Sequence, residues 1–474
     1  MVVLYLRIVF YVRMPRAQAG IVVIFGVLSG EKANRDEVFI SKWAAIALCI
    51  CVGLLAVLFL LVLSCRQRPD VIPVDEDPSI NLQLVFLWGF GLAMMIYLCI
   101  NIAIYLRCAI DRPDDYLHSI FRLLVNLLFI LFTVFQMVLL TYNKRSILRA
   151  TIQFHFSIVC ILAVNFALWY SSTVHTLFVN GNETEFSNVS CFHSSEIQKR
   201  LGSKISLILL PPQMEFYILA STLLIALWRN SIRYESTITR EPCKLTRDDS
   251  YEKICTLVSM GVKEKHLLAV TLGLFINIPI VLSAVLLDFV YEWQNKSVVM
   301  FLDFSDSLSA LFSCVLVYVS CIKIKRLTVA TTKPFLIRDY ILILSSTGMM
   351  AYFMIGVVAS MSGYTLSKST VVSRVFGMLE TFLQTYLLTR SSRHKANGNC
   401  RESTCISFCA LILVISNLTY WLLDSYNKHM ITKSRYIGFK DWKVVEVLFI
   451  PLVTFYRFFS GMGAYSMYKR FKPN

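Results

Sequence analysis

The sequence predicts an all-α, polytopic membrane protein with about twelve transmembrane helices, arranged as two homologous six-helix bundles in the same orientation. The first observation is composition: 56% of the residues are hydrophobic and 16% are charged, too few charges to cover a soluble domain of this length. The second is a series of continuous apolar runs, each long enough to cross about 30 Å of hydrocarbon as a helix. These runs do not alternate with polar residues, which argues against membrane strands. The third is that short motifs of the first half return in the second half.

The first half of the chain, residues 1–230, is expected to form six helices. Five of them are continuous apolar runs, at 41–64, 82–106, 118–141, 151–178 and 203–228. The remaining helix would come first in the chain, within residues 1–30, where three arginines and Pro15 interrupt the apolar run. Because buried charges are costly in hydrocarbon, this first helix is either broken or truncated.

Residues 231–263 predict a basic, polar linker that separates the two halves. The second half, residues 264–474, contains six further apolar runs, at 266–290, 298–322, 337–361, 371–390, 403–425 and 443–468.

The charges of the loops predict the orientation in the membrane. Basic residues gather in the linker and in the loops around 323–338 and 390–401, which fall on one side if twelve helices alternate. By the positive-inside rule that side is cytoplasmic, and both termini lie there. The glycosylation candidates Asn182, Asn188 and Asn295 fall on the opposite side. The net charge of +16 is thus explained by topology, and no nucleic-acid-binding signature accompanies it.

The repeat is visible in three pairs of segments that occur in the same order, about 240–250 residues apart. The matching residues are Gln136 and Gln384, Asn165 and Asn417 with Trp169 and Trp421, and Pro212 and Pro451 with their following aromatic residues. An even number of helices in each half makes this a parallel duplication, which usually places a permeation path inside or between the halves.

Motifs for enzymatic chemistry are absent from the sequence. There is no nucleotide-binding glycine loop, no nucleophile elbow and no zinc-protease motif. The 14 cysteines lie mostly in apolar runs and have no metal-binding spacing. We therefore expect neither an enzyme nor a bound cofactor or metal.

Ionisable residues within the spans are functional candidates, because they are costly to bury in a bilayer. Glu215 follows a double proline that opens the backbone hydrogen bonding beside it. Hydrocarbon favours the uncharged form of a carboxyl group, so Glu215 is suited to load and release protons near neutral pH. The alternative is a protonated or paired glutamate that ties helices together. Glu380 and Gln384 share one helix face. They either take part in proton transfer or form a hydrogen bond that only packs helices together.

Other polar residues have simpler interpretations. Arg457 cannot release its proton at physiological pH, so a structural role is favoured, with a carboxylate such as Glu215 or Glu446 as partner. Asp303 and Asp306 share a face near the external end of their helix. They either attract cations to an external mouth of the permeation path or are solvated residues near the start of the helix. His175, near the same side, is either a pH sensor or a surface residue.

The four matched amides Gln136, Asn165, Gln384 and Asn417 favour interhelical hydrogen bonds. The functional alternative is that they hold the waters of a proton wire.

Several stretches together resemble one family. Residues 156–169 (FSIVCILAVNFALW) and 212–220 (PQMEFYILA) are similar to the fifth and sixth helices of otopetrins. Residues 416–424 (SNLTYWLLD) and 451–458 (PLVTFYRF) are similar to the eleventh and twelfth helices.

The resemblance implies a homodimeric proton channel of the plasma membrane, which passes H⁺ down its gradient on extracellular acidification without a cofactor. Amide, glutamate and tyrosine residues line the family's routes, and Glu215, the four amides and Tyr456 match such positions. Cys160 stands where many family members have a histidine. A cysteine in apolar surroundings keeps its proton, so it is a weak substitute for an imidazole. Thr176 and Phe216 are further departures from the family pattern. Cys160, Thr176 and the interrupted first helix keep a non-conducting scaffold open as an alternative. The matched prolines keep a proton-coupled secondary transporter open as another.

Overall fold

The computed structural model describes most of the spans and few of the loops between them. The described residues are 35–66, 79–111, 116–144, 148–149, 151–179, 206–238, 262–289, 296–327, 337–365, 367–394, 400–426, 436 and 442–472. The expected first helix within 1–30, the central part of the linker and the three glycosylation candidates lie outside these residues.

The helices follow the predicted spans closely. In the first half they are α3 (Arg35–Arg66), α4 (Ile80–Asp111), α5 (Tyr116–Tyr142), α6 (Ile152–Val179) and α9 (Ser206–Ile238). In the second half they are α10 (Val262–Phe289), α11 (Lys296–Lys325), α12 (Ile337–Met361), α13 (Ser369–Ser391), α14 (Cys400–Tyr426) and α16 (Trp442–Phe471). The all-α, polytopic prediction is confirmed for these elements, and strands are absent from the part of the chain that the structure describes.

Nine of the eleven described helices are long and apolar enough to cross a membrane. The remaining two, α9 and α13, carry more polar residues, among them Glu215 and Glu380. Side chains on the outer surface are apolar, as in Leu55 and Phe275, which are 67% and 70% exposed. A surface of this kind with polar residues inside is typical of a protein whose solvent is lipid.

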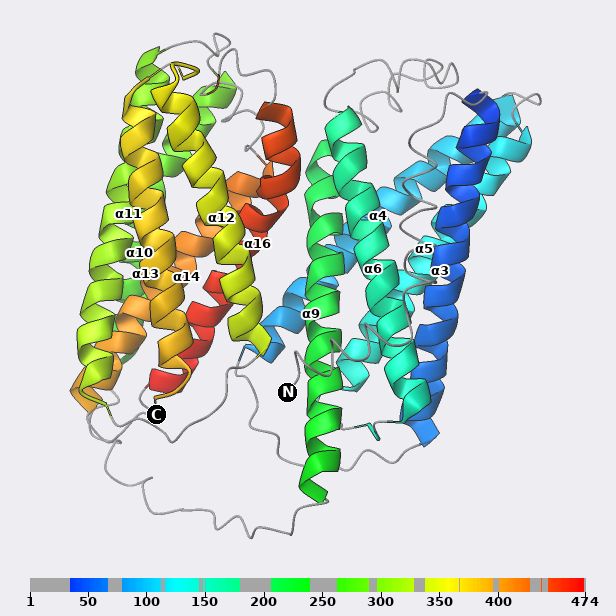
Figure 1. Cartoon of the computed structure of the whole chain (residues 1–474), viewed down its shortest axis with the longest axis horizontal. Coiled ribbons are helices and arrows are strands. Elements are labelled where there is room, and N and C mark those ends of the chain that lie inside the picture. The colour runs from blue at the N-terminus through cyan, green and yellow to red at the C-terminus, as the bar shows by residue number, and fades with distance from the viewer. Residues whose placement is uncertain are drawn as a thin grey trace.

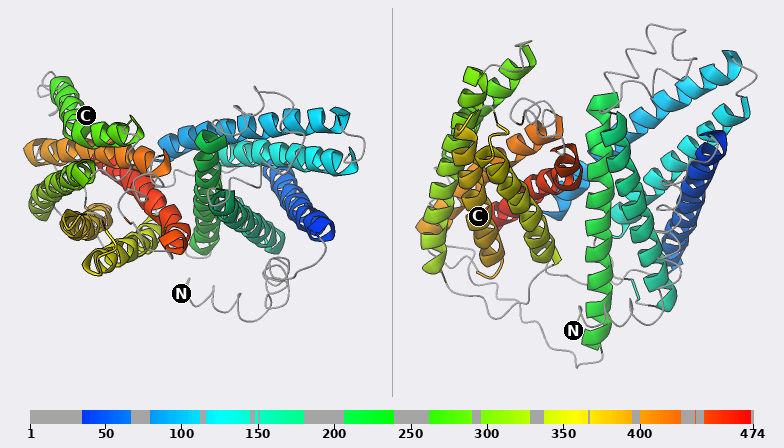
Figure 2. Two further views of the ribbon diagram at one scale, coloured as in Figure 1. Left: turned by 90° about the horizontal axis from the view of Figure 1, so that it is seen from above. Right: turned by 45° about the horizontal axis from the view of Figure 1, so that its top comes forward.

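The helices form two groups side by side (Figure 1). We define the N group as α3, α4, α5, α6 and α9, and the C group as α10 to α14 with α16. Figure 2 shows α9 and α16 near the centre and α4 reaching from the N group towards α14 and α16. At this boundary the rings of Phe86 and Phe90 lie against those of Trp421 and Phe458, with centroids 5.2–6.0 Å apart.

The two groups share one pattern of helix contacts. In the N group, α3 contacts α5 and α6, α9 contacts α4, α5 and α6, and α4 contacts α5. In the C group, α11 contacts α13 and α14, α16 contacts α12, α13 and α14, and α12 contacts α13. This correspondence supports the predicted duplication, while the twelve-helix layout and the boundaries 1–230, 231–263 and 264–474 stay predictions.

Candidate functional site

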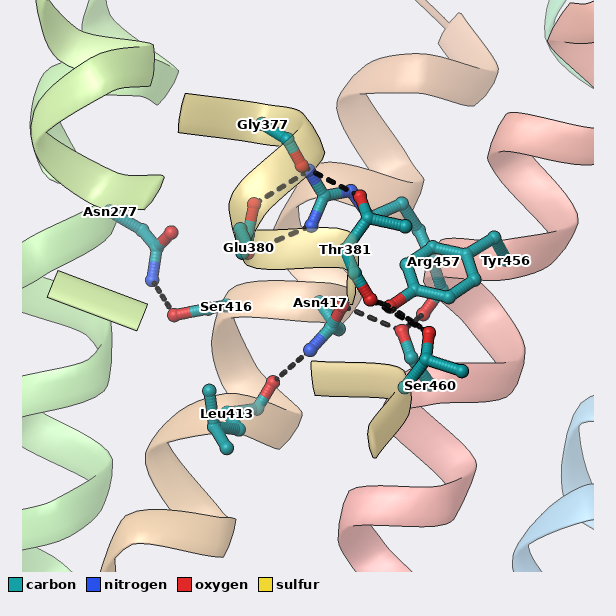
Figure 3. A network of polar contacts seen from close by, with 11 residues as sticks. Asn277, Gly377, Glu380, Thr381, Leu413, Ser416, Asn417, Tyr456, Arg457 and Ser460 are labelled. Carbon is teal, nitrogen blue, oxygen red and sulfur yellow. Dashed lines mark hydrogen bonds and ion pairs between the residues drawn. The ribbon is translucent and has the colours of Figure 1, made fainter. Parts of the chain in front are cut away.

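The C group contains a buried ion pair between α13 and α16. Glu380 and Arg457 are 2% and 4% exposed, and the guanidinium binds both carboxylate oxygens at 3.0 and 3.1 Å (Figure 3). Two parallel charge-assisted hydrogen bonds fix both the distance and the orientation of the groups. The expected pairing of Arg457 with a carboxylate is confirmed. The two examples named, Glu215 and Glu446, were wrong, because α13 packs beside α16 and brings Glu380 to the same depth.

A cavity of about 40 Å³ lies beside this pair. Its charged lining residues are Asp306, Arg374, Glu380, Asp424 and Arg457. They come from α11, α13, α14 and α16, so the cavity occupies the interior of the C group near the end at which α11 and α13 begin. A cavity of this size has room for about three water molecules.

Two donors in this cavity are not used within the described part of the chain. Arg374 Nη2 and Arg457 Nε are buried and have no hydrogen-bond partner among the described residues. A buried donor without a partner costs about 1–3 kcal/mol, so both arginines keep unused hydrogen-bonding capacity in the interior of the C group. The arrangement is therefore a small cavity with a charged lining.

Aromatic rings hold the two arginines. The Arg457 guanidinium lies 4.5 Å from the ring centre of Tyr420. Arg374 lies 5.4 Å from the ring centre of Tyr352 and donates from Nε to the Tyr436 hydroxyl at 3.0 Å. Tyr436 in turn stacks on Trp442, with centroids 3.6 Å apart. Cation–π contacts of this kind keep a guanidinium in place while leaving its charge unchanged.

The two aspartates predicted to form an external mouth have different surroundings. Asp303 is 1% exposed and accepts hydrogen bonds from Ser369 and Thr370, at 2.7 and 2.8 Å, beside the first residues of α13. A carboxylate there also compensates the positive end of the helix dipole. Asp306 lines the cavity instead. His175 belongs to α6, but its side chain lies outside the described residues.

Hydroxyl groups lie one helical turn deeper than the ion pair. Tyr456 donates from its hydroxyl to the Thr381 carbonyl at 3.0 Å and lies 3.2 Å from the Thr385 hydroxyl (Figure 3). Ser460 donates to Asn417 Oδ1 at 2.7 Å, and Asn417 Nδ2 donates to the Leu413 carbonyl. This cluster continues the polar interior of the C group away from the cavity.

Three of the four matched amides are isolated. Gln136, Asn165 and Gln384 are each 0% exposed, and neither polar atom of their amides has a hydrogen-bond partner among the described residues. Asn417 alone of the four has the hydrogen bonds expected of an amide that joins helices.

Glu215 lies at the boundary between the two groups and not beside the ion pair. The residue is 5% exposed, and its carboxylate accepts a hydrogen bond from the Trp421 indole nitrogen of α14 at 3.3 Å. Pro211 and Pro212 lie inside α9, just before it. The structure thus separates Glu215 from Glu380, the other predicted carboxylate.

Sequence reasoning did not select Asp424, Tyr420 or Tyr436. The signal for Asp424 was present, because it is a charged residue within a predicted span. Tyr420 and Tyr436 are ordinary aromatic residues in the sequence, and only the packing of α13 and α16 shows that they hold arginines.

A comparison with known families gives a single assignment. The sequence model of the family described as Otopetrin matches residues 174–458, which is more than half of the chain. A search of curated proteins finds no match. The matched segment includes α9 to α14 and most of α16, and therefore the ion pair, the cavity and Glu215. The chain belongs to the otopetrin family.

Proposed function

We propose that this protein is a proton-selective channel of the plasma membrane, which carries H⁺ down its electrochemical gradient and is opened by extracellular acid. Membership of the otopetrin family implies a membrane function of the proton-channel type. Selectivity, direction, acid gating and location are the parts that we add. The single observation that carries the proposal is the Glu380–Arg457 pair beside a small charged cavity.

The size of the cavity suits protons better than other ions. A metal cation that kept its water shell would need a wider polar pore, and one that lost it would need a ring of oxygen ligands to replace that shell. The cavity has room for about three waters, which leaves too little space for a hydrated metal cation. A proton needs neither space nor ligands of its own, because it moves along hydrogen bonds.

The proposed route begins at Asp306 and Asp424 and reaches Glu380 through cavity water. The Glu380 carboxylate can accept a proton on an oxygen that now binds Arg457, which breaks one hydrogen bond while Arg457 keeps its charge. From there the hydroxyl of Tyr456 and the amide of Gln384, one turn deeper, provide the next polar groups. Glu215, bonded to Trp421, offers a separate carboxylate at the boundary of the groups.

Orientation and assembly are also proposals. The positive-inside rule applied to the basic loops supports cytoplasmic termini, so that the cavity opens towards the extracellular side, where acid would act. Homodimerisation is carried by the family resemblance alone.

Whole-cell current recording with a cytosolic pH dye tests the proposal. External pH is lowered in steps with Na⁺, K⁺ or a large organic cation as the bulk cation. We expect an inward current that does not saturate, acidifies the cytosol and has a reversal potential that follows the proton gradient in all three solutions.

Other outcomes would contradict the proposal. Flux that saturates and depends on a solute would indicate a transporter, for which the prolines inside α9 and α16 would be the broken-helix site. Absence of current in cells with confirmed surface expression would indicate a non-conducting scaffold.

A further inference from the structure

The two groups differ at the positions that carry the ion pair. The internal repeat aligns the two groups at three pairs of residues, which are Gln136 with Gln384, Asn165 with Asn417, and Tyr217 with Tyr456. Four residues before the matched glutamines, the N group has Phe132 where the C group has Glu380. One residue after the matched tyrosines, it has Ile218 where the C group has Arg457. At both positions that hold the ion pair in the C group, the N group therefore has an apolar residue.

A third position shows the same difference. The residue before the matched asparagines is Val164 in the N group and Ser416 in the C group. Ser416 accepts a hydrogen bond from Asn277 at 3.1 Å, whereas Val164 is 6% exposed and belongs to the apolar core.

Phe132 and Val164 close tightly on α3. Gly53 faces both of them, and a Cβ atom at this glycine would lie 2.9 Å from Phe132 Cε2 and 3.0 Å from Val164 Cγ1. The absence of a side chain at Gly53 thus lets α3, α5 and α6 come together around the Phe132 ring, which is 0% exposed. At the corresponding level the C group has the charged cavity.

An apolar contact of this kind excludes the waters that a proton wire needs, since hydrophobic constrictions close by dewetting. Gln136 lies one turn deeper than Phe132 on α5 and, like Gln384 in the C group, has no hydrogen-bond partner among the described residues. The two groups therefore differ in the residue one turn before the amide, which is Phe132 in the N group and Glu380 beside the cavity in the C group.

We infer that Phe132 and Val164, packed on Gly53, close the N group to water, so that protons cross this protein through the C group. This inference rests on the proposed function and adds the route.

Matched substitutions test the route. Gln136→Leu and Gln384→Leu change equivalent residues that are both fully buried. Leucine is close to glutamine in size and removes polar atoms that have no partner, so both variants should fold. With currents normalised to surface expression, we expect Gln384→Leu to reduce the proton current at least about tenfold and Gln136→Leu to change it less than about twofold.

Three outcomes would overturn the inference. A larger loss in Gln136→Leu would place the route in the N group, and equal losses would mean that both groups conduct. If neither variant loses current while Glu215→Gln does, the route follows the boundary between the groups.

Hydroxyl-radical footprinting of the wild-type protein, at neutral and acidic pH, tests the inference without any variant or current. Phe132 and Phe353 are the matched probes, because both are buried phenylalanines and only Phe353 lines the cavity. We expect oxidation of Phe353 at several times the rate of Phe132, and equal rates would overturn the inference. A wild-type protein without proton current would defeat the proposed function, while the footprint would still show whether the N group is dry.

Discussion

Replacing Glu380 with glutamine leaves the Arg457 guanidinium in the interior without its counter-charge. Both side chains are almost fully buried, at 3% and 5% exposed. Breaking a buried, bidentate pair by removing one partner costs about 3–5 kcal/mol, because the remaining charge stays desolvated. We therefore expect Glu380→Gln and Arg457→Met each to lower the free energy of unfolding by about that amount.

The double variant Glu380→Gln/Arg457→Met separates this reasoning from a general loss of packing. With neither charge left, it should lose less than either single variant, because apolar replacement of both partners of a buried pair is often neutral. Reversible unfolding in mixed micelles, titrated with a denaturing detergent, measures all four proteins. Glu402→Gln is the control, because Glu402 pairs with Lys323 and Arg326 in a more solvated place, where ion pairs contribute little. Single variants as stable as the wild type, or losses that simply add in the double variant, would refute the account of the pair.

Two further changes address other parts of the site. Glu215→Gln should change the proton current by less than about twofold at equal surface expression, because Glu215 lies at the boundary of the two groups and does not line the cavity of the C group; a sharp loss of current would place Glu215 on the path. Gly356→Ala should lower the free energy of unfolding by about 1–3 kcal/mol, because a Cβ atom there would lie 2.6 Å from the Tyr436 hydroxyl that binds Arg374. Gly461→Ala is the matched control, because its nearest neighbour, Asn417 Cβ, would be 3.5 Å away; equal losses in the two alanine variants, measured by the same detergent titration, would contradict this packing argument.

The helices could be predicted from the sequence because membrane spans depend on local composition. A run such as 118–141 is predominantly apolar, and the helix α5 (Tyr116–Tyr142) follows it to within two residues at each end. The polar candidates were also visible, because a glutamate in an apolar run is conspicuous wherever the helix packs.

The interaction partners of these polar side chains could not be predicted, because they depend on how each helix is rotated and on which helix lies opposite. Glu380 and Arg457 are 77 positions apart in the chain, and no periodicity along α13 or α16 indicates that they meet. Asp303 and Asp306 show the limit of a shared face. Three residues turn a helix by about 300°, so the two side chains point about 60° apart. This angle is enough to direct Asp303 to the start of α13 and Asp306 to the cavity.

Proton flux through the purified protein in sealed liposomes tests the central claim most directly. An acid gradient is imposed with a pH-sensitive dye inside the vesicles, a potassium ionophore to compensate charge, and no solute or nucleotide. We predict that vesicles with the wild-type protein lose the gradient much faster than empty vesicles, and that those with Glu380→Gln do not. Wild-type vesicles that hold the gradient as long as empty ones would contradict the account.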